Sequence, residues 1–167
     1  MSSQDHQAFA RLVNKYQSGL RHYMRRLTAG DHHGAEDLAQ DTFLMVYTKL
    51  HQYKSTGSFK SWLYTIAYRL FLDRLQKLKT VSYEQLMPTP PLAHNPMDAD
   101  IYAEQLMRLL KPKERALLTL AYVEGMSHQE IEKITQLPLG SIKSYIHRAK
   151  QKLQQAVIQA EETQSNR

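Results

Sequence analysis

The sequence predicts an all-α protein in which a proline-rich linker joins two small helical bundles. Three observations support this prediction. Apolar residues in the N-terminal half recur at the 3.6-residue spacing of an amphipathic helix. Four of the six prolines fall within residues 88–96, where the sequence has neither a helical nor a strand period. Residues 127–153 carry the pattern of two short helices that are joined by a tight turn.

The N-terminal bundle is expected to contain three helices, each with one apolar stripe that is wide enough to pack against two neighbours. Asp31 is expected to cap the second helix and Ser58 the third, because short polar side chains accept hydrogen bonds from free N–H groups at a helix start. The three stripes run from Phe9 to Leu27, from Ala35 to Leu50 and from Phe59 toward Leu78.

The C-terminal bundle is expected to open with a helix from Asp98 to Leu110. Pro112 suits the first turn of the next helix, because its missing N–H would have no partner there, and Gly125 is expected to end that helix. The predicted organisation is therefore an N-terminal bundle at residues 1–80, an extended linker at 81–97, a C-terminal bundle at 98–160 and a disordered tail at 161–167.

The segment from residue 127 to residue 153 predicts a helix-turn-helix. Ser127 and Glu130 have the spacing of a capping box at the start of the first helix. Pro138 suits the first turn of the second helix. One buried face of that second helix is predicted from steps of four, three and four residues, at Ile142, Ile146, Ala149 and Leu153.

The second helix of this motif is basic. From Leu139 to Leu153 it has four Lys or Arg residues and no Asp or Glu. An ordinary amphipathic helix with a solvated basic face is the alternative interpretation. The capped partner helix and the proline-marked turn favour DNA binding, in which the second helix lies in the major groove and its cations neutralise phosphates.

Composition narrows the classes of protein. The net charge of +6 favours a polyanionic partner. The absence of cysteine excludes disulfides and cysteine-ligated zinc. We expect a cytoplasmic protein, because the sequence has no membrane-spanning run and no signal peptide. The adjacent His32 and His33 complete no ligand set, so no metal or cofactor is predicted. The sequence has no nucleophile–base pair, phosphate loop or HExxH motif, so we predict that it is not an enzyme.

Two features of the N-terminal bundle are not explained by packing. The second helix carries a strip that consists of Asp37, Gln40, Asp41 and Leu44. One explanation is that carboxylates near a helix N-terminus are favoured by the helix dipole. The other is that the strip binds a basic protein partner. The third helix carries aromatic and cationic residues on its polar side, which suits single-stranded nucleic acid. The alternative is that Phe59 and Trp62, at the start of this helix, are ordinary residues of the hydrophobic core. The residues on this polar side are Lys60, Tyr64, Thr65, Tyr68 and Arg69.

Three stretches, taken in order, resemble bacterial RNA polymerase sigma factors of the extracytoplasmic-function (ECF) subgroup. AEDLAQDTF at residues 35–43 resembles the family's helix that binds core polymerase. GSFKSWLYTIAYRLFLDRLQK at 57–77 resembles its segment for promoter melting and minus-ten recognition. The segment from Leu110 to Leu153, with EGMSHQEI and PLGSIKSYIHRAK, resembles its minus-thirty-five-binding domain. The order and spacing of the three stretches make the resemblance specific.

The resemblance implies a sigma initiation factor, which binds core RNA polymerase, directs it to specific promoters and aids promoter melting. The clamp helices of the largest polymerase subunit would be bound by Asp37, Gln40, Asp41 and Leu44. Minus-ten DNA, including a base flipped from the non-template strand, would be contacted by Tyr53, Lys54, Ser55, Ser58, Lys60, Trp62, Tyr64, Thr65 and Arg69. Minus-thirty-five DNA would be contacted by Ser141, Lys143, Ser144, Tyr145, His147 and Arg148.

Four places depart from the family's usual pattern. Glu132 replaces a small apolar residue, and Thr135-Gln136 replaces a common Leu-Gly at the turn, so both bear on the geometry of the motif. Tyr145 replaces a frequent Arg, and Arg69 replaces a frequent Asn. These two bear on promoter preference, because Tyr cannot make the bidentate contact that Arg makes with guanine.

The alternative function is a helix-turn-helix transcription regulator with an N-terminal sensing or dimerisation domain. It explains the C-terminal bundle but leaves the strip from Asp37 to Leu44 and the aromatic, basic third helix without a role. The partners implied by the resemblance are core RNA polymerase and promoter DNA. An anti-sigma protein is a further candidate partner, because members of the family are often controlled in that way.

Overall fold

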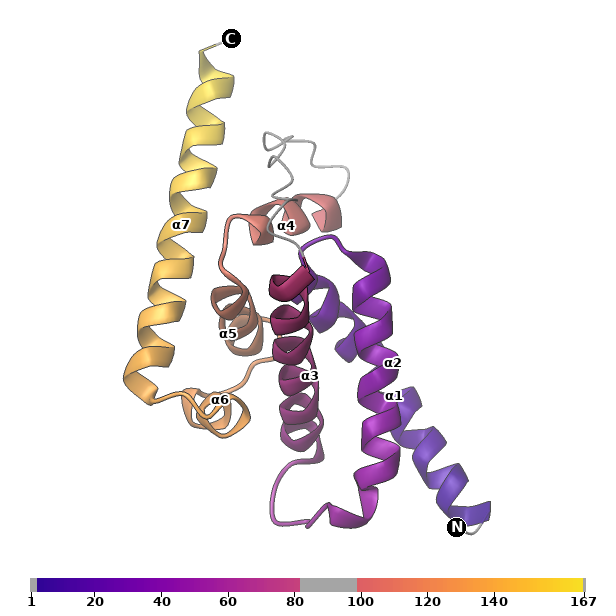
Figure 1. The fold of residues 1–167 in the computed structure, drawn as a ribbon. Coiled ribbons are helices and arrows are strands. Elements are labelled where there is room, and N and C mark those ends of the chain that lie inside the picture. Colours follow the sequence, from indigo (N-terminus) through magenta and orange to yellow (C-terminus); the bar gives the residue numbers. More distant parts are fainter. Residues whose placement is uncertain (1–2, 82–98, 167) are drawn as a thin grey trace.

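The computed structural model describes residues 3–81 and 99–166, and these residues form seven α-helices and one short 3-10 helix, without a β-strand (Figure 1). The all-α prediction is confirmed. The predicted linker lies outside the described residues apart from residue 81, which ends a helix. Within the described ranges, no helix is both long enough and apolar enough to cross a membrane.

The N-terminal unit contains α1 (Ser3–Thr28), α2 (His32–Lys49), the short 3-10 helix η1 (Leu50–Gln52) and α3 (Phe59–Val81). Helix α2 packs against both α1 and α3 around a buried core. Both predicted caps are present. The carboxylate of Asp31 accepts a hydrogen bond from the Gly34 N–H at 2.9 Å, and the Ser58 hydroxyl accepts one from the Ser61 N–H at 3.3 Å.

The C-terminal unit contains α4 (Ala99–Arg108), α5 (Pro112–Tyr122), α6 (His128–Thr135) and α7 (Leu139–Ser165). Gly125, with φ +67°, lies in the turn after α5. The predicted capping box of α6 is present, because Ser127 and Glu130 exchange hydrogen bonds of 3.1 and 2.8 Å. Pro138 directly precedes α7, and its carbonyl accepts the first helical hydrogen bond, from the Ile142 N–H.

Helix α7 is longer than the sequence predicted. The expected disorder from residue 161 differs from the structure, in which the helix continues to Ser165. The continuation has a local cause, because residues 154–165 contain neither Gly nor Pro and are rich in Gln, Ala and Glu, which favour a helix. In Figure 1 this part of α7 extends beyond the other helices of its unit.

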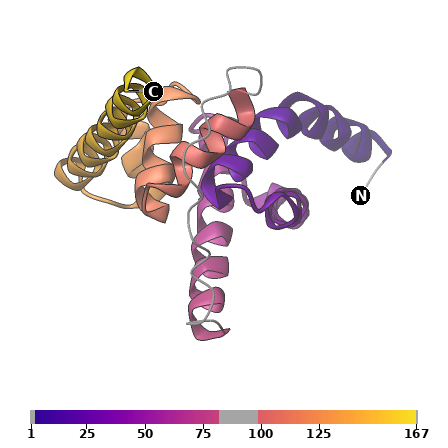
Figure 2. The same cartoon turned by 90° about the horizontal axis from the view of Figure 1, so that it is seen from above.

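The two units pack side by side. Helices α4 and α5 lie against α1, and α6 lies against α3. Figures 1 and 2 show α3 between the C-terminal unit and α2, with α7 on the outer side of the C-terminal unit. The start of α3, where minus-ten contacts were expected, therefore lies next to the helix-turn-helix.

Candidate nucleic-acid interface

The strip on α2 faces outward. Gln40 and Asp41 are exposed, and 64% of Leu44 is accessible to solvent, which is unusual for a leucine in a helical bundle. Asp37 is half-exposed and lies 3.7 Å from the exposed His33 ring. The neighbouring Glu36 differs, because it turns toward α1 and pairs with Arg21 at 2.9 Å. Packing within the chain thus leaves an acidic and apolar strip available to a partner.

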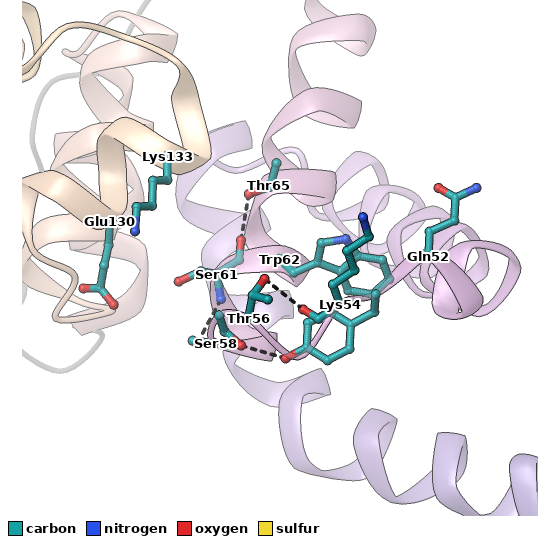
Figure 3. A pocket seen from close by; sticks show the side chains of 11 residues that line it. Gln52, Lys54, Thr56, Ser58, Ser61, Trp62, Thr65, Glu130 and Lys133 are labelled. Atoms are coloured by element: carbon teal, nitrogen blue, oxygen red, sulfur yellow. Dashed lines mark hydrogen bonds between the residues drawn. The ribbon is translucent and has the colours of Figure 1, made fainter.

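A cavity of about 380 Å³ lies where the loop after η1 meets the start of α3 (Figure 3). It brings together five of the nine residues that were expected to contact minus-ten DNA: Tyr53, Lys54, Ser58, Trp62 and Thr65. Gln52, Thr56, Gly57 and Ser61 complete the N-terminal side of its lining. Glu130 and Lys133 of α6 form the opposite side, so the cavity spans both units.

Aromatic rings form a wall of this cavity. The ring of Tyr53 lies 5.2 Å from that of Trp62 and 5.5 Å from that of Phe59, between centroids. The Tyr53 hydroxyl donates to the Gly57 carbonyl at 2.8 Å, which holds the loop against the rings. Trp62 and Phe59 are half-buried, so one side of each ring packs on the core and another side is accessible to solvent. An unstacked base needs such a ring face and nearby hydroxyl or amide groups.

The sequence predicted that two tyrosines lie on the polar side of α3, but both are buried in the structure. Tyr64, expected to contact DNA, is only 1% accessible, and Tyr68 is also buried. The Tyr64 ring packs against Tyr23 of α1, at 5.0 Å between centroids, and its hydroxyl faces Glu124 of the C-terminal unit. Burial raises the pKa of Tyr64 well above its usual range, and the neighbouring Glu124 carboxylate raises it further. Burial likewise raises the pKa of Tyr68 to about 12, with a smaller effect from Tyr145.

Lys60 also faces the C-terminal unit. Its ammonium lies 3.1 Å from the Glu124 carboxylate and 3.2 Å from the Glu124 carbonyl oxygen. The Glu124 side chain is only 8% accessible, whereas that of Lys60 is 36% accessible. Arg69 lies further along α3 and is exposed, and the expected contact residue Ser55 is exposed in the loop before α3.

The turn of the helix-turn-helix keeps a left-handed residue although the sequence has no glycine there. Gln136 ends α6 with φ +59°, and its N–H donates to the Glu132 carbonyl at 2.8 Å. The Gln136 amide donates to the Lys133 carbonyl, and the Leu137 N–H donates to the Thr135 hydroxyl. These bonds hold the turn in a conformation that costs most non-glycine residues energy.

The first half of α7 presents most of the residues expected to contact minus-thirty-five DNA. Lys143, Ser144, His147 and Arg148 are exposed. Ser141 and Tyr145 are half-buried. The Arg148 guanidinium stacks over the Tyr145 ring at 4.8 Å from its centroid. Ile142, Ile146 and Ala149 are buried and Leu153 is half-buried against the core, which confirms the predicted apolar face.

The basic face of α7 is not all directed outward, which corrects the sequence-based interpretation. Lys152 pairs with Glu114 of α5 at 2.7 Å, and the Glu114 side chain is 2% accessible. The Lys150 ammonium lies 3.0 Å from the Tyr122 hydroxyl. Lys152 therefore holds α7 against α5, because a buried carboxylate needs a charged partner, and Lys150 adds a contact with the exposed Tyr122. Lys143 and Arg148 are exposed, and Lys150 is exposed as well although it contacts Tyr122.

Sequence reasoning missed the residues that join the two units. Arg115 donates to the Leu27 carbonyl at 2.8 Å, and Arg108 donates to the Ala29 carbonyl at 3.0 Å. Glu124 was missed as the partner of Lys60. No local signal marks these residues, because charged side chains on amphipathic helices normally face solvent and their partners here are 64 to 88 residues away.

Comparisons with known proteins identify similar chains for both units. A family model described as Sigma-70 region 2 matches residues 12–80. A second, described as Sigma-70, region 4, matches residues 101–153. The chain is 30% identical to the ECF RNA polymerase sigma factor SigW of Bacillus subtilis, over 89% of this chain and 88% of SigW. It is 31% identical to the ECF RNA polymerase sigma factor RpoE of Cereibacter sphaeroides, over 90% and 87% of the two chains.

Two solved structures share the fold. One is the sigma factor RpoE of Bartonella quintana in complex with the anti-sigma factor NepR, with a TM-score of 0.74, 24% identity, and coverage of 90% of this chain and 96% of that chain. The other is CnrH in complex with the cytosolic domain of CnrY, with a TM-score of 0.67, 21% identity, and coverage of 93% and 90%. Both similarities extend over the two helical units together.

Proposed function

The chain belongs to the ECF subgroup of bacterial RNA polymerase sigma factors, and we propose that it binds core RNA polymerase, directs it to specific promoters and aids promoter melting. Sigma factors are initiation factors rather than enzymes, so polymerase supplies the chemistry of transcription. We further propose that the chain acts in the cytoplasm, where polymerase and promoters are located.

The cavity at the start of α3 is the observation that carries the proposal. Its aromatic wall and surrounding hydroxyl groups suit a base that has left the duplex, and Lys54 beside it suits the strand's phosphates. Binding the flipped base there would offset part of the cost of unpairing, which is a few kcal/mol. The remaining expected contacts on α3, including Lys60 and Arg69, would follow the same strand.

The strip on α2 supports core polymerase binding. Asp37, Gln40 and Asp41 would meet basic groups of the polymerase clamp helices, and Leu44 would add an apolar contact. The exposure of Leu44 in the free chain supports this role, because an exposed apolar residue among charged residues is typical of a protein-binding surface.

The exposed side of α7 supports a duplex contact at the minus-thirty-five element. Lys143 and Arg148 would neutralise phosphates, while Ser144 and His147 lie near the helix start, which enters the major groove in this motif. The Tyr145 ring would contact base edges or sugars without the bidentate readout of an arginine. An anti-sigma protein is also a proposed partner, because the Bartonella RpoE structure of the same fold is a complex with one.

A helix-turn-helix regulator is the competing function, and bubble-containing DNA separates the two. We expect the chain together with core polymerase to bind duplexes with a central unpaired bubble more tightly than fully paired duplexes of the same sequence. The preference should weaken when Lys54, which lines the cavity, is changed to Ala. It should persist when Lys49, exposed on α2 away from the cavity, is changed to Ala.

Two results would contradict the proposal. The first is equal binding of bubble and paired DNA over a set of sequences. The second is the absence of any complex between the chain and core polymerase. Both together would favour a regulator that binds duplex DNA alone.

A further inference from the structure

A cation on the recognition helix lies against an aromatic ring one turn earlier. The Arg148 guanidinium is 4.8 Å from the centroid of the Tyr145 ring. Residues three apart on a helix are neighbours on its surface, so the pair forms within α7 itself. Arg148 is exposed, whereas Tyr145 is half-buried and packs against the hydrophobic core. One member of the pair is thus fixed by the fold, and the other reaches into solvent.

The Tyr145 ring is held by its surroundings. Ile142 and Ile146, which flank it along α7, are buried and attach this part of the helix to the core. The ring also lies near Tyr68 of α3, because burial is the main cause that raises the pKa of Tyr68 and Tyr145 raises it further. A packed aromatic ring has few rotamers available, so it offers Arg148 a surface of fixed position.

The charge of Arg148 is not taken up by the buried carboxylate nearby. Glu114 bonds to Lys152 through both carboxylate oxygens, at 3.0 and 2.7 Å. Burial and a hydrogen bond from Lys152 have the largest effects on the pKa of that carboxyl. Arg148 has the smallest of the effects on it. Lys152 therefore leaves the Arg148 guanidinium available to an anion outside the chain.

Stacking on a ring leaves the hydrogen-bonding groups of an arginine free. A guanidinium is planar, and its five N–H donors lie in that plane and point away from its edges. A ring beneath the plane contacts the face of the cation through its π electrons and does not compete for these donors. Two of the donors can then bind one phosphate side by side. Arg148 over Tyr145 therefore has the form of a phosphate ligand whose orientation is set before DNA arrives.

Lys143 provides a contrast on the same helix. It is exposed as well, but it lies two residues before Tyr145, and residues two apart on a helix do not face each other. A free side chain loses rotamer freedom when it binds a partner, whereas a side chain that is already held in place loses less. The ring therefore distinguishes Arg148 from Lys143 in how much ordering a phosphate contact requires.

We propose that Tyr145 is a positioning residue, which holds the Arg148 guanidinium in the orientation that binds a backbone phosphate of duplex DNA. Tyr145 acts through Arg148, in addition to the ring contact with DNA that the proposed function includes. The proposal rests on the proposed function in one respect, since it takes the exposed side of α7 as a DNA surface. It gives a role to one departure from the family's pattern, because this tyrosine supports a cation instead of supplying one.

Nuclear magnetic resonance of the full chain tests the geometry without DNA. Protons that lie over an aromatic ring are shifted upfield by its ring current, so the side-chain protons of Arg148 should resonate upfield of the usual arginine range. Tyr145→Phe keeps a ring and should keep this shift, whereas Tyr145→Leu should remove it. Ordinary arginine shifts in the parent chain would overturn the proposal, because the ring would then not hold the guanidinium.

Fluorescence anisotropy with a labelled random-sequence duplex tests the role in binding, because a phosphate contact does not depend on sequence. Tyr145→Leu should weaken binding of the full chain about two- to fivefold, which is the strength of an exposed cation–π pair expressed as a ratio of affinities. Tyr145→Phe should bind like the parent. Tyr102→Leu, which changes a half-buried tyrosine of α4, is the control for the loss of a ring and should also bind like the parent.

A double-variant cycle shows whether Tyr145 acts through Arg148. The loss caused by Tyr145→Leu should largely disappear in an Arg148→Ala chain and should persist in a Lys143→Ala chain. An equal loss in both chains, or no loss in the parent chain, would overturn the positioning role alone. If Arg148→Ala bound the duplex like the parent, the positioning role would fall together with the Arg148 contact that the proposed function assigns.

Discussion

At the scale of single residues, carboxylates with similar chemistry have different roles that depend on what faces them. Asp31 caps α2 and pairs with Arg74, Glu114 is buried against Lys152, and Glu124 faces Lys60. Asp37 and Asp41 differ, because Asp41 is exposed and Asp37 is half-exposed beside the exposed His33 ring. The first three stabilise the chain internally, whereas the last two are available to a partner.

The strip on α2 gives the first prediction. Changing Asp37 and Asp41 together to Ala should weaken core polymerase binding by roughly tenfold or more, or about 1.4 kcal/mol, because two charges that face a basic partner are lost. The helical circular dichroism should not change. Glu36→Ala is the control, since this neighbouring carboxylate pairs with Arg21 within the chain. Equal affinity of the double variant and the parent would refute the assignment.

Glu114 gives a prediction about acid stability. Burial opposes ionisation of this carboxyl, but hydrogen bonds from Lys152 and from the Lys111 N–H outweigh burial and hold its pKa below the usual 4.5. A lowered pKa in the folded state stabilises the fold above the ordinary pKa. That stabilisation is lost as the pH falls from about 4.5 through the lowered pKa.

The measurement is urea unfolding at several pH values. Glu114→Gln should lose about 1–2 kcal/mol at pH 7, where the parent's charged hydrogen bonds are intact. The gap between the two proteins should narrow as the pH falls below 4.5. Glu161→Gln, on the exposed end of α7, should follow the parent throughout. A gap that stays constant with pH would show that ionisation of Glu114 is not the source of the stability.

At the scale of elements, the helix-turn-helix shows how a motif tolerates unusual residues. The turn keeps its left-handed residue with Gln136 where glycine is common, and side-chain hydrogen bonds around it hold the geometry. The recognition helix is fixed to α5 by Lys152, and Lys150 adds a contact with Tyr122, so part of its charge has a structural role. The departures at Gln136 and Tyr145 therefore alter local detail without removing the motif.

The turn gives a prediction from two matched variants. Gln136→Gly and Gln136→Ala both remove the side-chain amide, but only Ala keeps a Cβ in the left-handed conformation. The Gly variant should be more stable by about 1 kcal/mol, with a correspondingly higher melting temperature in calorimetry. Equal melting temperatures would mean that the turn does not hold this residue in a strained conformation.

The recognition helix gives a prediction about salt dependence. Arg148→Ala should weaken binding of the polymerase complex to promoter duplex and reduce the slope of log affinity against log salt by about 0.9, because one phosphate contact is lost. Lys150→Ala is the control, since Lys150 contacts Tyr122 and should change the slope less. An unaltered slope for Arg148→Ala would place this residue away from the DNA.

At the scale of the whole molecule, the two units pack together, with α4 and α5 against α1 and α6 against α3. The pattern of apolar residues predicted the helices, the caps at Asp31 and Ser58 and the helix-turn-helix, because these depend on neighbours within a few turns. It did not predict the burial of Tyr64, whose ring packs against Tyr23 of α1 and whose hydroxyl bonds to Glu124, 60 residues away. Periodicity describes which face of a helix is apolar, but it does not describe which other unit covers a polar face.

Of the candidate site, the sequence predicted the half that lies on the N-terminal unit but not the half on the C-terminal unit. Tyr53, Lys54, Ser58, Trp62 and Thr65 do line one cavity, because they lie within one loop and the following turns of one helix. Glu130 and Lys133, which form its other side, could not be assigned without the arrangement of the two units. The cavity is therefore lined by both units, and its shape depends on how they pack.

Transcription from a library of bacterial genomic fragments, with purified core polymerase and sequencing of the RNA 5′ ends, tests the central claim most directly. The account predicts start sites that require both the chain and core polymerase. Upstream of these starts it predicts two shared sequence elements, at the minus-ten and minus-thirty-five positions. A complete lack of chain-dependent start sites, together with no binding of the chain to core polymerase, would contradict the assignment as a sigma initiation factor.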